Sequence, residues 1–196
     1  GRKKLAEALQ QRNFDYVREL ALKQVEFGAD VLDVNVGVPG IDDVALIPDV
    51  IKVISETVKV PLCIDSPNAK VLEAALKVAQ GKVLVNSTNG EEKTLSAVLP
   101  LVKKYGAAVI GLTLDDNGIP ADPEVRLKIA AKIIERAAQL GIPIEDVVID
   151  PLVMTVGADQ NAGAITLKTI ELVRNEFGVN INLGASNVSF GLPDRH

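Results

Sequence analysis

A regular alternation of short apolar runs and longer amphipathic segments constrains this chain more than any other feature. Six runs rich in Val, Ile and Leu predict strands buried on both faces, which is typical of a parallel sheet covered by helices. These strands are Val31–Asn35, Pro61–Asp65, Lys82–Asn86, Ala107–Thr113, Val147–Asp150 and Asn180–Leu183. The helices predicted around them are Phe14–Phe27, Ile41–Thr57, Pro67–Gln80, Glu91–Tyr105, Pro123–Leu140 and Ala162–Phe177. The chain is therefore predicted to be an α/β protein.

Local signals mark the ends of several helices. Glycines such as Gly141 and Gly178 follow a helical segment, and glycine readily adopts the left-handed conformation that commonly ends a helix. Ser66-Pro67 and Asp122-Pro123 each place a side-chain oxygen before a proline, which is typical of an N-cap followed by the first helical residue. We therefore expect Ser66 and Asp122 to cap the helices that follow them.

Two architectures fit alternating strands and helices: an open doubly wound sheet and a (β/α)8 barrel. An open sheet binds its ligand at one switch point, whereas a barrel brings the carboxyl ends of all its strands around one mouth. The sequence has no GxGxxG or Walker motif, and a polar residue ends most of the predicted strands, which favours the TIM barrel. Because barrels need eight strands and typically about 250 residues, we expect residues 1–196 to be a single domain that lacks the first strand and the last strand-helix unit. A complete open sheet of six units is the alternative.

Composition excludes several classes of function. The net charge of −5 and the pI near 5.0 argue against nucleic-acid binding, which needs a clustered basic surface. Cys63 is the only cysteine, which excludes an internal disulfide and a cysteine-cluster metal site, and its apolar surroundings predict a packed thiol. No apolar run is long enough to span a membrane, and the first residues do not resemble a signal peptide. We expect a cytoplasmic protein that binds neither nucleic acid nor membranes.

Carboxylates and carboxamides dominate the candidate site. Four of them lie at the ends of predicted strands: Asn35, Asp65, Asn86 and Asp150. After the last strand, the stretch Gly184–Pro193 sets Asn187 between the hydroxyls of Ser186 and Ser189. The single histidine, His196, ends the chain, and we expect no metal ligand set. Such groups suit a flat heterocycle whose edge alternates donors and acceptors, or a sugar, because a carboxylate accepts two parallel N–H bonds and an amide supplies complementary pairs. A diphosphate is not expected, because Lys and Arg are absent between the strand ends and the helix starts.

Six runs in order resemble the pterin-binding methyltransferases. They are DVNVG, PLCIDSPN, VNSTNG, LTLDDNGIP, IDPLVMTVG and GASNVSFGLP. This family includes methyltetrahydrofolate:corrinoid protein methyltransferases and the folate domain of cobalamin-dependent methionine synthase. The resemblance covers essentially the whole chain, and it implies the same complete (β/α)8 barrel, and hence the same missing first strand and last unit, that the strand count predicts.

The resemblance also implies a reaction. It implies transfer of a methyl group from N5 of methyltetrahydrofolate, or a related methyl-tetrahydropterin, to the cob(I)alamin of a separate corrinoid protein. Asp65, Asn86 and Asp150 would hydrogen-bond the pterin, and Asn187 would contact the nitrogen that bears the methyl group and act as the catalytic residue. An amide can accept from the protonated nitrogen or donate to the neutral one, and so favour the charged transition state. Family members often form homodimers.

Three further residues are expected to contact substrate, and two of them also have a structural alternative. Asn35 equally fits a backbone-bonding role in the core, as does Asp33; Asp115 lies in the sequence Asp-Asp-Asn-Gly, which is ordinary turn chemistry. Ser189 completes the expected set. Dihydropteroate synthase is the nearest alternative function, but it needs cations near the last strands for a departing diphosphate, and this chain has Asn187-Val188-Ser189 there. A non-catalytic pterin-binding domain is the third reading.

Overall fold

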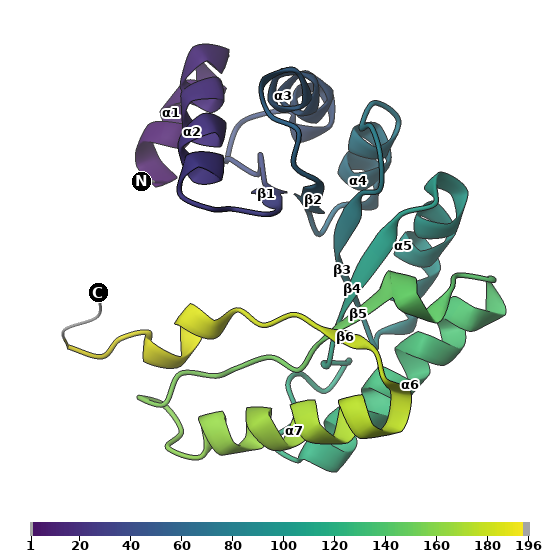
Figure 1. The fold of residues 1–196 in the computed structure, drawn as a ribbon. Helices are drawn as coiled ribbons and strands as arrows, with labels where there is room; N and C mark the ends of the chain where they lie inside the picture. Colours follow the sequence, from purple (N-terminus) through teal and green to yellow (C-terminus); the bar gives the residue numbers. More distant parts are fainter. Residues whose placement is uncertain (1, 194–196) are drawn as a thin grey trace. The chain divides into compact units, whose positions relative to one another are not determined.

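The computed structural model describes residues 2–193, which form an alternating α/β chain (Figure 1). The α-helices are α1 (Arg2–Gln10), α2 (Phe14–Glu26), α3 (Asp43–Thr57), α4 (Ala69–Leu76), α5 (Glu92–Tyr105), α6 (Pro123–Gln139) and α7 (Ala162–Phe177). The strands are β1 (Leu32–Val34), β2 (Leu62–Asp65), β3 (Leu84–Asn89), β4 (Ala108–Leu112), β5 (Val147–Asp150) and β6 (Asn180–Ile181). Two short 3₁₀ helices, Ile144–Asp146 and Ala185–Ser189, complete the described chain. None of the helices among residues 2–193 has the length and apolarity needed to cross a membrane.

The strands form a sheet in chain order, β1-β2-β3-β4-β5-β6. The pairings β1–β2, β2–β3, β4–β5 and β5–β6 are all parallel. A doubly wound sheet reverses its strand order at a switch point, whereas the strands of a barrel follow the chain. The strand order thus confirms the predicted parallel α/β class and argues against the doubly wound alternative. That residues 1–196 lack the first strand and the last strand-helix unit of a (β/α)8 barrel stays a prediction.

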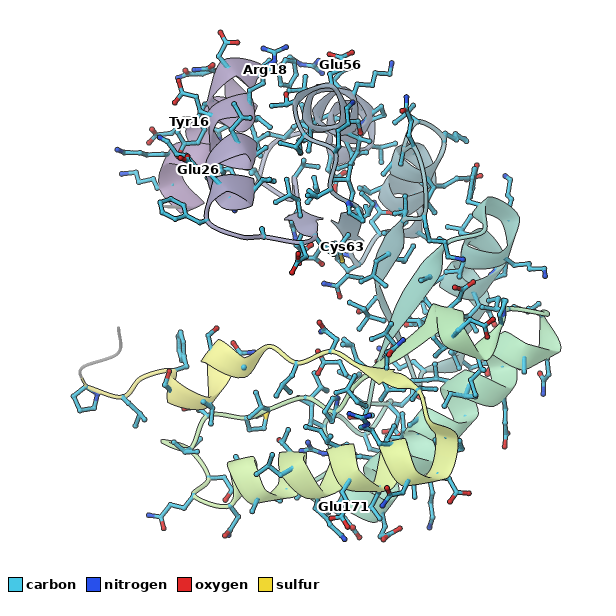
Figure 2. The ribbon with its side chains drawn as sticks, viewed as in Figure 1. Tyr16, Arg18, Glu26, Glu56, Cys63 and Glu171 are labelled. Carbon is cyan, nitrogen blue, oxygen red and sulfur yellow. The ribbon has the colours of Figure 1, made fainter. Side chains whose placement is uncertain are left out.

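Packing divides the chain into two compact units, Gly1–Asn86 with Lys104–Ala107 and Ser87–Lys103 with Ala108–His196. In the first unit the core lies between α3, α4 and the strands, where Ile51, Ile64 and Leu72 have no exposed surface. On the outer side of this unit, Glu26 and Glu56 project away from α2 and α3 (Figure 2). That the whole chain is one pterin-binding domain stays a prediction.

The second unit has its core between α5, α6, β4 and β5. Leu95, Leu99, Ile133 and Ile149 are completely buried there. A side chain at Gly111 in β4 would meet Ile133 at 2.9 Å, so the glycine allows α6 to approach the strand closely. Each unit therefore has an apolar layer beneath the carboxyl ends of its strands, where the candidate site residues lie.

Several predicted boundaries differ from the structure. The expected N-cap Ser66 is wrong, because α4 begins later and Asn68 caps it, accepting from the Lys70 amide at 3.0 Å. Ser66 instead accepts from the Asn68 amide at 3.2 Å. The cap at Asp122 is confirmed, since its carboxylate accepts from the Glu124 amide at 2.9 Å and a proline begins α6. Helix α1 was not predicted, because it has a weak apolar pattern: among its residues 3–10 only Ala8 and Leu9 are buried.

Two strand ends also differ from prediction. Asn86 does not end its strand, because β3 continues to Asn89. Thr88, which is polar but β-branched, fits a pleated strand and is fully buried, so the strand extends beyond its apolar part. The last strand, β6, contains only Asn180 and Ile181, because the chain leaves the ladder after the amide of Asn182 donates to the carbonyl of Ile149 at 3.0 Å.

Candidate functional site

The first unit gathers a polar cluster at the carboxyl ends of β1, β2 and β3. Asp65 ends β2, and its carboxylate accepts a hydrogen bond from the Asn35 amide nitrogen at 2.9 Å. The Asn35 carbonyl oxygen in turn accepts from the Gly37 amide at 2.8 Å, which fixes the orientation of the Asn35 side chain. Asn86 lies opposite Asp65 in the β2–β3 register. The structure therefore brings Asn35, Asp65 and Asn86 together, as the sequence predicts.

Asp33 belongs to this cluster as well, although it is not among the residues that the sequence predicts to contact substrate. It lies opposite Cys63 in the β1–β2 register and bonds the side chains of Asn86 and Cys63. Partial burial raises the pKa of Asp33, the negative charge of Asp65 raises it further, and the bonds from Asn86 and Cys63 oppose this shift. The sequence contains a signal for this placement of Asp33. Side chains alternate along a strand, so Asp33 and Asn35, two residues apart, share a face.

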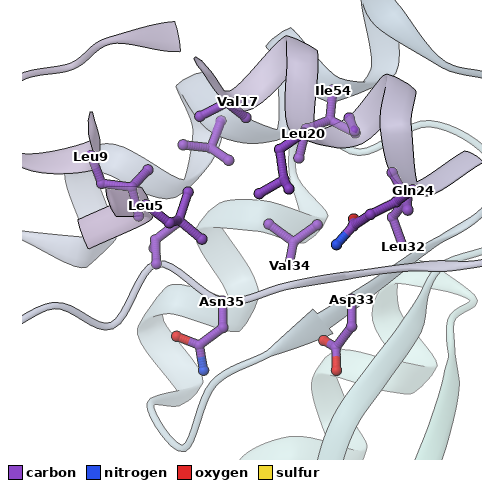
Figure 3. A pocket seen from close by; sticks show the side chains of 13 residues that line it. Leu5, Leu9, Val17, Leu20, Gln24, Leu32, Asp33, Val34, Asn35 and Ile54 are labelled. Carbon is purple, nitrogen blue, oxygen red and sulfur yellow. The ribbon is translucent and has the colours of Figure 1, made fainter. Parts of the chain in front are cut away.

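The side chains of β1 separate into two environments (Figure 3). Asp33 and Asn35 point to one side, whereas Val34 points to the other, toward α2. The polar side lines a cavity of about 790 Å³ together with Asp65 and residues of α1 and α2. A smaller space of about 90 Å³ has mostly apolar walls, formed by Leu32, Val34 and residues of α1, α2 and α3, and Asp33 and Asn35 border it as well. The first unit thus offers an open, acidic and amide-bearing surface above an apolar base.

Cys63 is a buried free cysteine next to this surface. Burial raises the pKa of its thiol to about 12, and the charges of Asp33 and Asp65 add to the shift. The thiol therefore stays protonated near neutral pH, and the thiolate is the reactive form. The prediction of a packed thiol is confirmed.

The second unit holds one carboxylate very firmly. Asp150 ends β5 and is only 6% exposed. One carboxylate oxygen accepts from the Leu152 amide at 2.8 Å, and the other accepts from the side-chain amide of Asn182 at 2.7 Å. Burial raises the pKa of Asp150, and these two bonds oppose the shift. The sequence did not predict a role for Asn182 in the site. It lies inside the predicted strand Asn180–Leu183, and no local pattern sets its side chain apart from that of Asn180.

The remaining predicted residues lie on loops of the second unit. Asp115 closes a tight turn, since its carboxylate accepts from the Asn117 amide at 2.9 Å and its backbone bonds that of Gly118. Asn187 lies in the 3₁₀ helix Ala185–Ser189, is exposed, and folds over Gly184, where a side chain would meet its amide nitrogen at 3.0 Å. The Ser189 hydroxyl donates to the carbonyl of Ser186 at 3.2 Å.

The loop that carries Asn187 is tied to the loop that follows β5. The Val156 amide donates to the carbonyl of Val188 at 3.0 Å, and the Thr155 hydroxyl donates to the carbonyl of Phe190 at 2.6 Å. Residues far apart in the sequence, on either side of α7, thus hold the Asn187 loop beside the segment that begins at Asp150. Backbone contacts hold this loop, Asn187 is exposed on it, and Ser189 is half-buried with its hydroxyl bonded to Ser186.

Comparison with known protein families matches residues 2–194 to the family described as pterin binding enzyme. Among curated proteins, a methylcorrinoid:tetrahydrofolate methyltransferase of Eubacterium limosum is 29% identical over 191 residues, which is 96% of this chain and 70% of that protein. A methionine synthase of Mycobacterium tuberculosis is 30% identical over 203 aligned residues, which is 98% of this chain but 17% of that protein.

Solved structures with the same fold include dihydropteroate synthases. A Yersinia pestis DHPS with a pterine-sulfa conjugate superposes with a TM-score of 0.68 at 17% identity. The matched region covers 87% of this chain and 67% of the Yersinia pestis chain. A dihydropteroate synthase of Clostridium difficile, solved in the presence of pteroic acid, gives a TM-score of 0.66 at 26% identity over the same shares. These likenesses agree with the barrel class that the strand order favours.

Proposed function

We propose that this chain, which belongs to the family of pterin-binding enzymes, transfers a methyl group from N5 of methyltetrahydrofolate to the cob(I)alamin of a corrinoid protein. Its similarity to a methylcorrinoid:tetrahydrofolate methyltransferase and to a methionine synthase supports this choice of reaction. The name of the first relative describes transfer from methylcorrinoid to tetrahydrofolate. The direction of methyl transfer is therefore tested by assays that start from methyltetrahydrofolate and assays that start from the methylated corrinoid protein.

The observation that carries the proposal is the state of Asp150. It is buried and each of its oxygens already accepts one N–H bond. A carboxylate oxygen has two lone pairs, so one remains on each oxygen for a ligand. A pterin presents two parallel N–H donors on its amino-oxo-pyrimidine edge, and a carboxylate fixed in this way matches such an edge in two bonds. In our proposal Asp65 and Asn86 bind the same ring, with Asn35 holding Asp65 and Asp115 and Ser189 bordering the substrate.

Asn187 is the proposed catalytic residue. In methyl transfer the N5–methyl bond breaks, N5 keeps its electron pair, and the cobalt substrate supplies the pair for the new bond to carbon. Charge therefore changes at N5, and a group that bonds N5 more strongly in the transition state than in the ground state accelerates the step. An amide can accept from a protonated N5 or donate to a neutral one. The exposed side chain of Asn187, on a loop anchored to the segment after Asp150, suits this role.

Dihydropteroate synthesis is the second candidate, supported by the likeness to solved dihydropteroate synthases. That reaction expels a diphosphate, whose charge needs cationic side chains. Residues 182–193, the described part of the chain after β6, contain no Lys or Arg, and the first cation in the sequence after β6 is Arg195. The methyl transfer requires no such cations, so we favour it. If the chain is instead a non-catalytic pterin-binding domain, it should bind tetrahydrofolate but transfer no methyl group.

The decisive experiment mixes the chain with methyltetrahydrofolate and a reduced corrinoid protein and follows the cobalt absorption spectrum. We expect conversion of cob(I)alamin to methylcobalamin, and loss of the methyl group when the product is mixed with tetrahydrofolate. Asp150→Asn should abolish tetrahydrofolate binding in calorimetry. Binding of tetrahydrofolate without methyl transfer to the corrinoid protein or to free cob(I)alamin would refute the methyltransferase and support the binding domain. Formation of dihydropteroate would support the second candidate.

A further inference from the structure

Asp150 is clamped between two groups that come from different elements. Leu152, two residues after β5, donates its backbone N–H to one oxygen, and Asn182, one residue after β6, donates its side-chain amide to the other. The backbone of Asp150 is fixed too, because its carbonyl accepts from both the amide and the hydroxyl of Thr113 at 3.0 and 3.2 Å. The carboxylate plane is therefore set by its neighbours before any ligand arrives.

Leu152 reaches Asp150 only because its backbone is held in an unfavourable conformation. Its φ is +57°, in the left-handed region that residues with a branched side chain rarely adopt. The carbonyl of Leu152 accepts from Arg126 at 2.7 Å, and Arg126 also bonds the carbonyl of Pro151 at 2.6 Å. The Thr166 hydroxyl lies 3.0 Å from the Leu152 carbonyl and shares its one proton between that carbonyl and the carbonyl of Ala162 at 2.9 Å. A strained residue persists where its surroundings over-determine it. Arg126 and Thr166 provide that restraint.

Arg126 is unusual in its own right. It lies on α6, is 2% exposed, and its third bond goes to the carbonyl of Pro120 at 2.6 Å. Burial lowers the pKa of this guanidinium. Its three hydrogen bonds all end on backbone carbonyls. Burying this cation carries a desolvation penalty that lowers the stability of the fold. In return, the guanidinium fixes the geometry of the loop after β5.

Asn182 is placed with equal care. Its backbone amide donates to the carbonyl of Ile149 at 3.0 Å, which continues the β5–β6 ladder by one residue beyond β6. In that ladder Ile149 lies opposite Ile181, so Asn182 stands opposite Asp150 and its side chain meets the carboxylate directly.

We infer that Asn182 and Arg126 are positioning residues for Asp150, Asn182 by a direct bond and Arg126 through the Leu152 backbone, and that together they aim its free lone pairs at a paired N–H donor edge. This inference rests on the proposed function in one respect only, the assignment of a pterin to that edge. The clamp itself is a property of the protein without ligand. Neither residue needs to touch the substrate.

The clamp has a consequence for pH. Both bonds donate to the ionised carboxylate, so removing one favours the protonated form and raises the pKa of Asp150 further. The residues around Asp150 are Leu112 at the end of β4, Thr113 just after it, Asn182 beyond β6, Thr166 of α7 and Arg126 of α6. Arg126 is the titratable group among these, and it stays protonated throughout the acid range. A shifted titration therefore reports on Asp150.

The test compares Asn182→Leu with Asn180→Leu, the same chemical change two residues earlier on an exposed position of β6. The carboxyl carbon of Asp150 is titrated by NMR in the free protein, with Asp150→Asn used to assign its signal. A bond to a charged group is worth enough that we expect Asn182→Leu to raise the pKa of Asp150 by roughly one unit, about tenfold in the ionisation constant. Asn180→Leu should leave it unchanged. Equal titration in wild type and Asn182→Leu, or equal shifts in both variants, would overturn the inference.

A second measurement brings in the pterin. Calorimetry with tetrahydrofolate over a pH series should show that Asn182→Leu moves the acid limb of binding to higher pH and weakens binding about tenfold at neutral pH. Failure of the wild type to bind tetrahydrofolate overturns the proposed function, while the NMR titration still decides the clamp. Thr166→Val, which removes one bond to Leu152 with little change in volume, should shift the pKa of Asp150 in the same direction by a smaller amount. If Asn182→Leu does not fold, Asn182→Ser makes the same comparison, because its hydroxyl is too short to reach Asp150.

Discussion

Gly90, directly after β3, is a position where one added methyl group should destabilise the protein strongly. A Cβ atom there would lie 2.8 Å from a side-chain carbon of Ile129 and 2.9 Å from the backbone carbonyl oxygen of Leu114. Both distances are shorter than real Cβ contacts, and the carbonyl cannot rotate away as the end of a flexible side chain does. The same glycine donates its N–H to that carbonyl at 2.8 Å, and its own carbonyl accepts from Lys132 at 2.5 Å. Any shift that relieves the contact therefore disturbs these bonds.

The expected cost of Gly90→Ala follows from these contacts. Overpacking typically costs about 1–3 kcal/mol, and weakening the bond to Leu114 adds roughly 1 kcal/mol. Together they predict a loss of about 2–4 kcal/mol in the free energy of unfolding. Gly163 in α7 is the matched control, because a Cβ there has open space and alanine favours a helix by roughly 0.5–1 kcal/mol.

Urea denaturation followed by circular dichroism measures both variants. Gly90→Ala should lower the denaturation midpoint, and Gly163→Ala should leave it unchanged or raise it. A Gly90→Ala midpoint within error of the wild type would refute the close approach of α6 and the β4 loop to the end of β3. Because Gly90 bonds the loop that leads to Asp115, a folded Gly90→Ala protein should also show altered substrate affinity if Asp115 borders the substrate.

Three further predictions concern the polar residues. Asn187→Ala should keep tetrahydrofolate binding within about tenfold, roughly 1.4 kcal/mol, while slowing methyl transfer much more; equal losses in calorimetry and kinetics would make Asn187 a binding residue only. Cys63 should resist alkylation by iodoacetamide at pH 8 in the folded protein and react on unfolding, because its thiol is buried with a pKa of about 12; fast labelling of the native protein would contradict this. The pKa of Asp33 is raised in the folded state, so its ionisation destabilises the fold as the pH rises above the pKa that Asp33 has in the unfolded chain. Asp33→Asn should therefore increase the free energy of unfolding at pH 7 more than at pH 3 in urea titrations. An equal gain at both pH values would exclude the ionisation of Asp33 as its cause.

The sequence predicted most elements because their signals are local. Each of the six strands overlaps one of the runs rich in Val, Ile and Leu, and Asp122-Pro123 supplies both an N-cap and a proline that suits the first helical turn. The failures occur where tertiary contacts outweigh such signals. Ser66-Pro67 carries the same pattern as Asp122-Pro123, but Asn68 caps α4 instead. β3 continues through Thr88 because burial and pairing, rather than apolar composition, extend it.

The candidate site was predictable only in part for a similar reason. Asp65 and Asp150 end apolar runs, so their position at a sheet edge follows from the alternation alone. Asn182 and Arg126 have no such mark, because the groups they bond are 32 residues away for Asn182 and 25 or 26 residues away for the Arg126 contacts after β5. Only the parallel register and the packing of α6 bring these residues to the carboxylate. Residues that position other residues are therefore the part of a site that a sequence reveals least.

The two units use the same device to hold a carboxylate. In the first, Asn35 follows β1 by one residue and bonds Asp65, the last residue of the paired strand β2. In the second, Asn182 follows β6 by one residue and bonds Asp150, the last residue of the paired strand β5. The register explains both, because the residue pairs before them, Val34 with Ile64 and Ile181 with Ile149, lie directly opposite. An amide one step beyond a strand end is thus in reach of a carboxylate at the neighbouring end whenever two parallel strands finish level. If this geometry is what orients the carboxylates, Asn35→Leu should weaken tetrahydrofolate binding in calorimetry, as Asn182→Leu does. A loss of affinity in only one of the two variants would show that the shared register does not by itself orient both carboxylates.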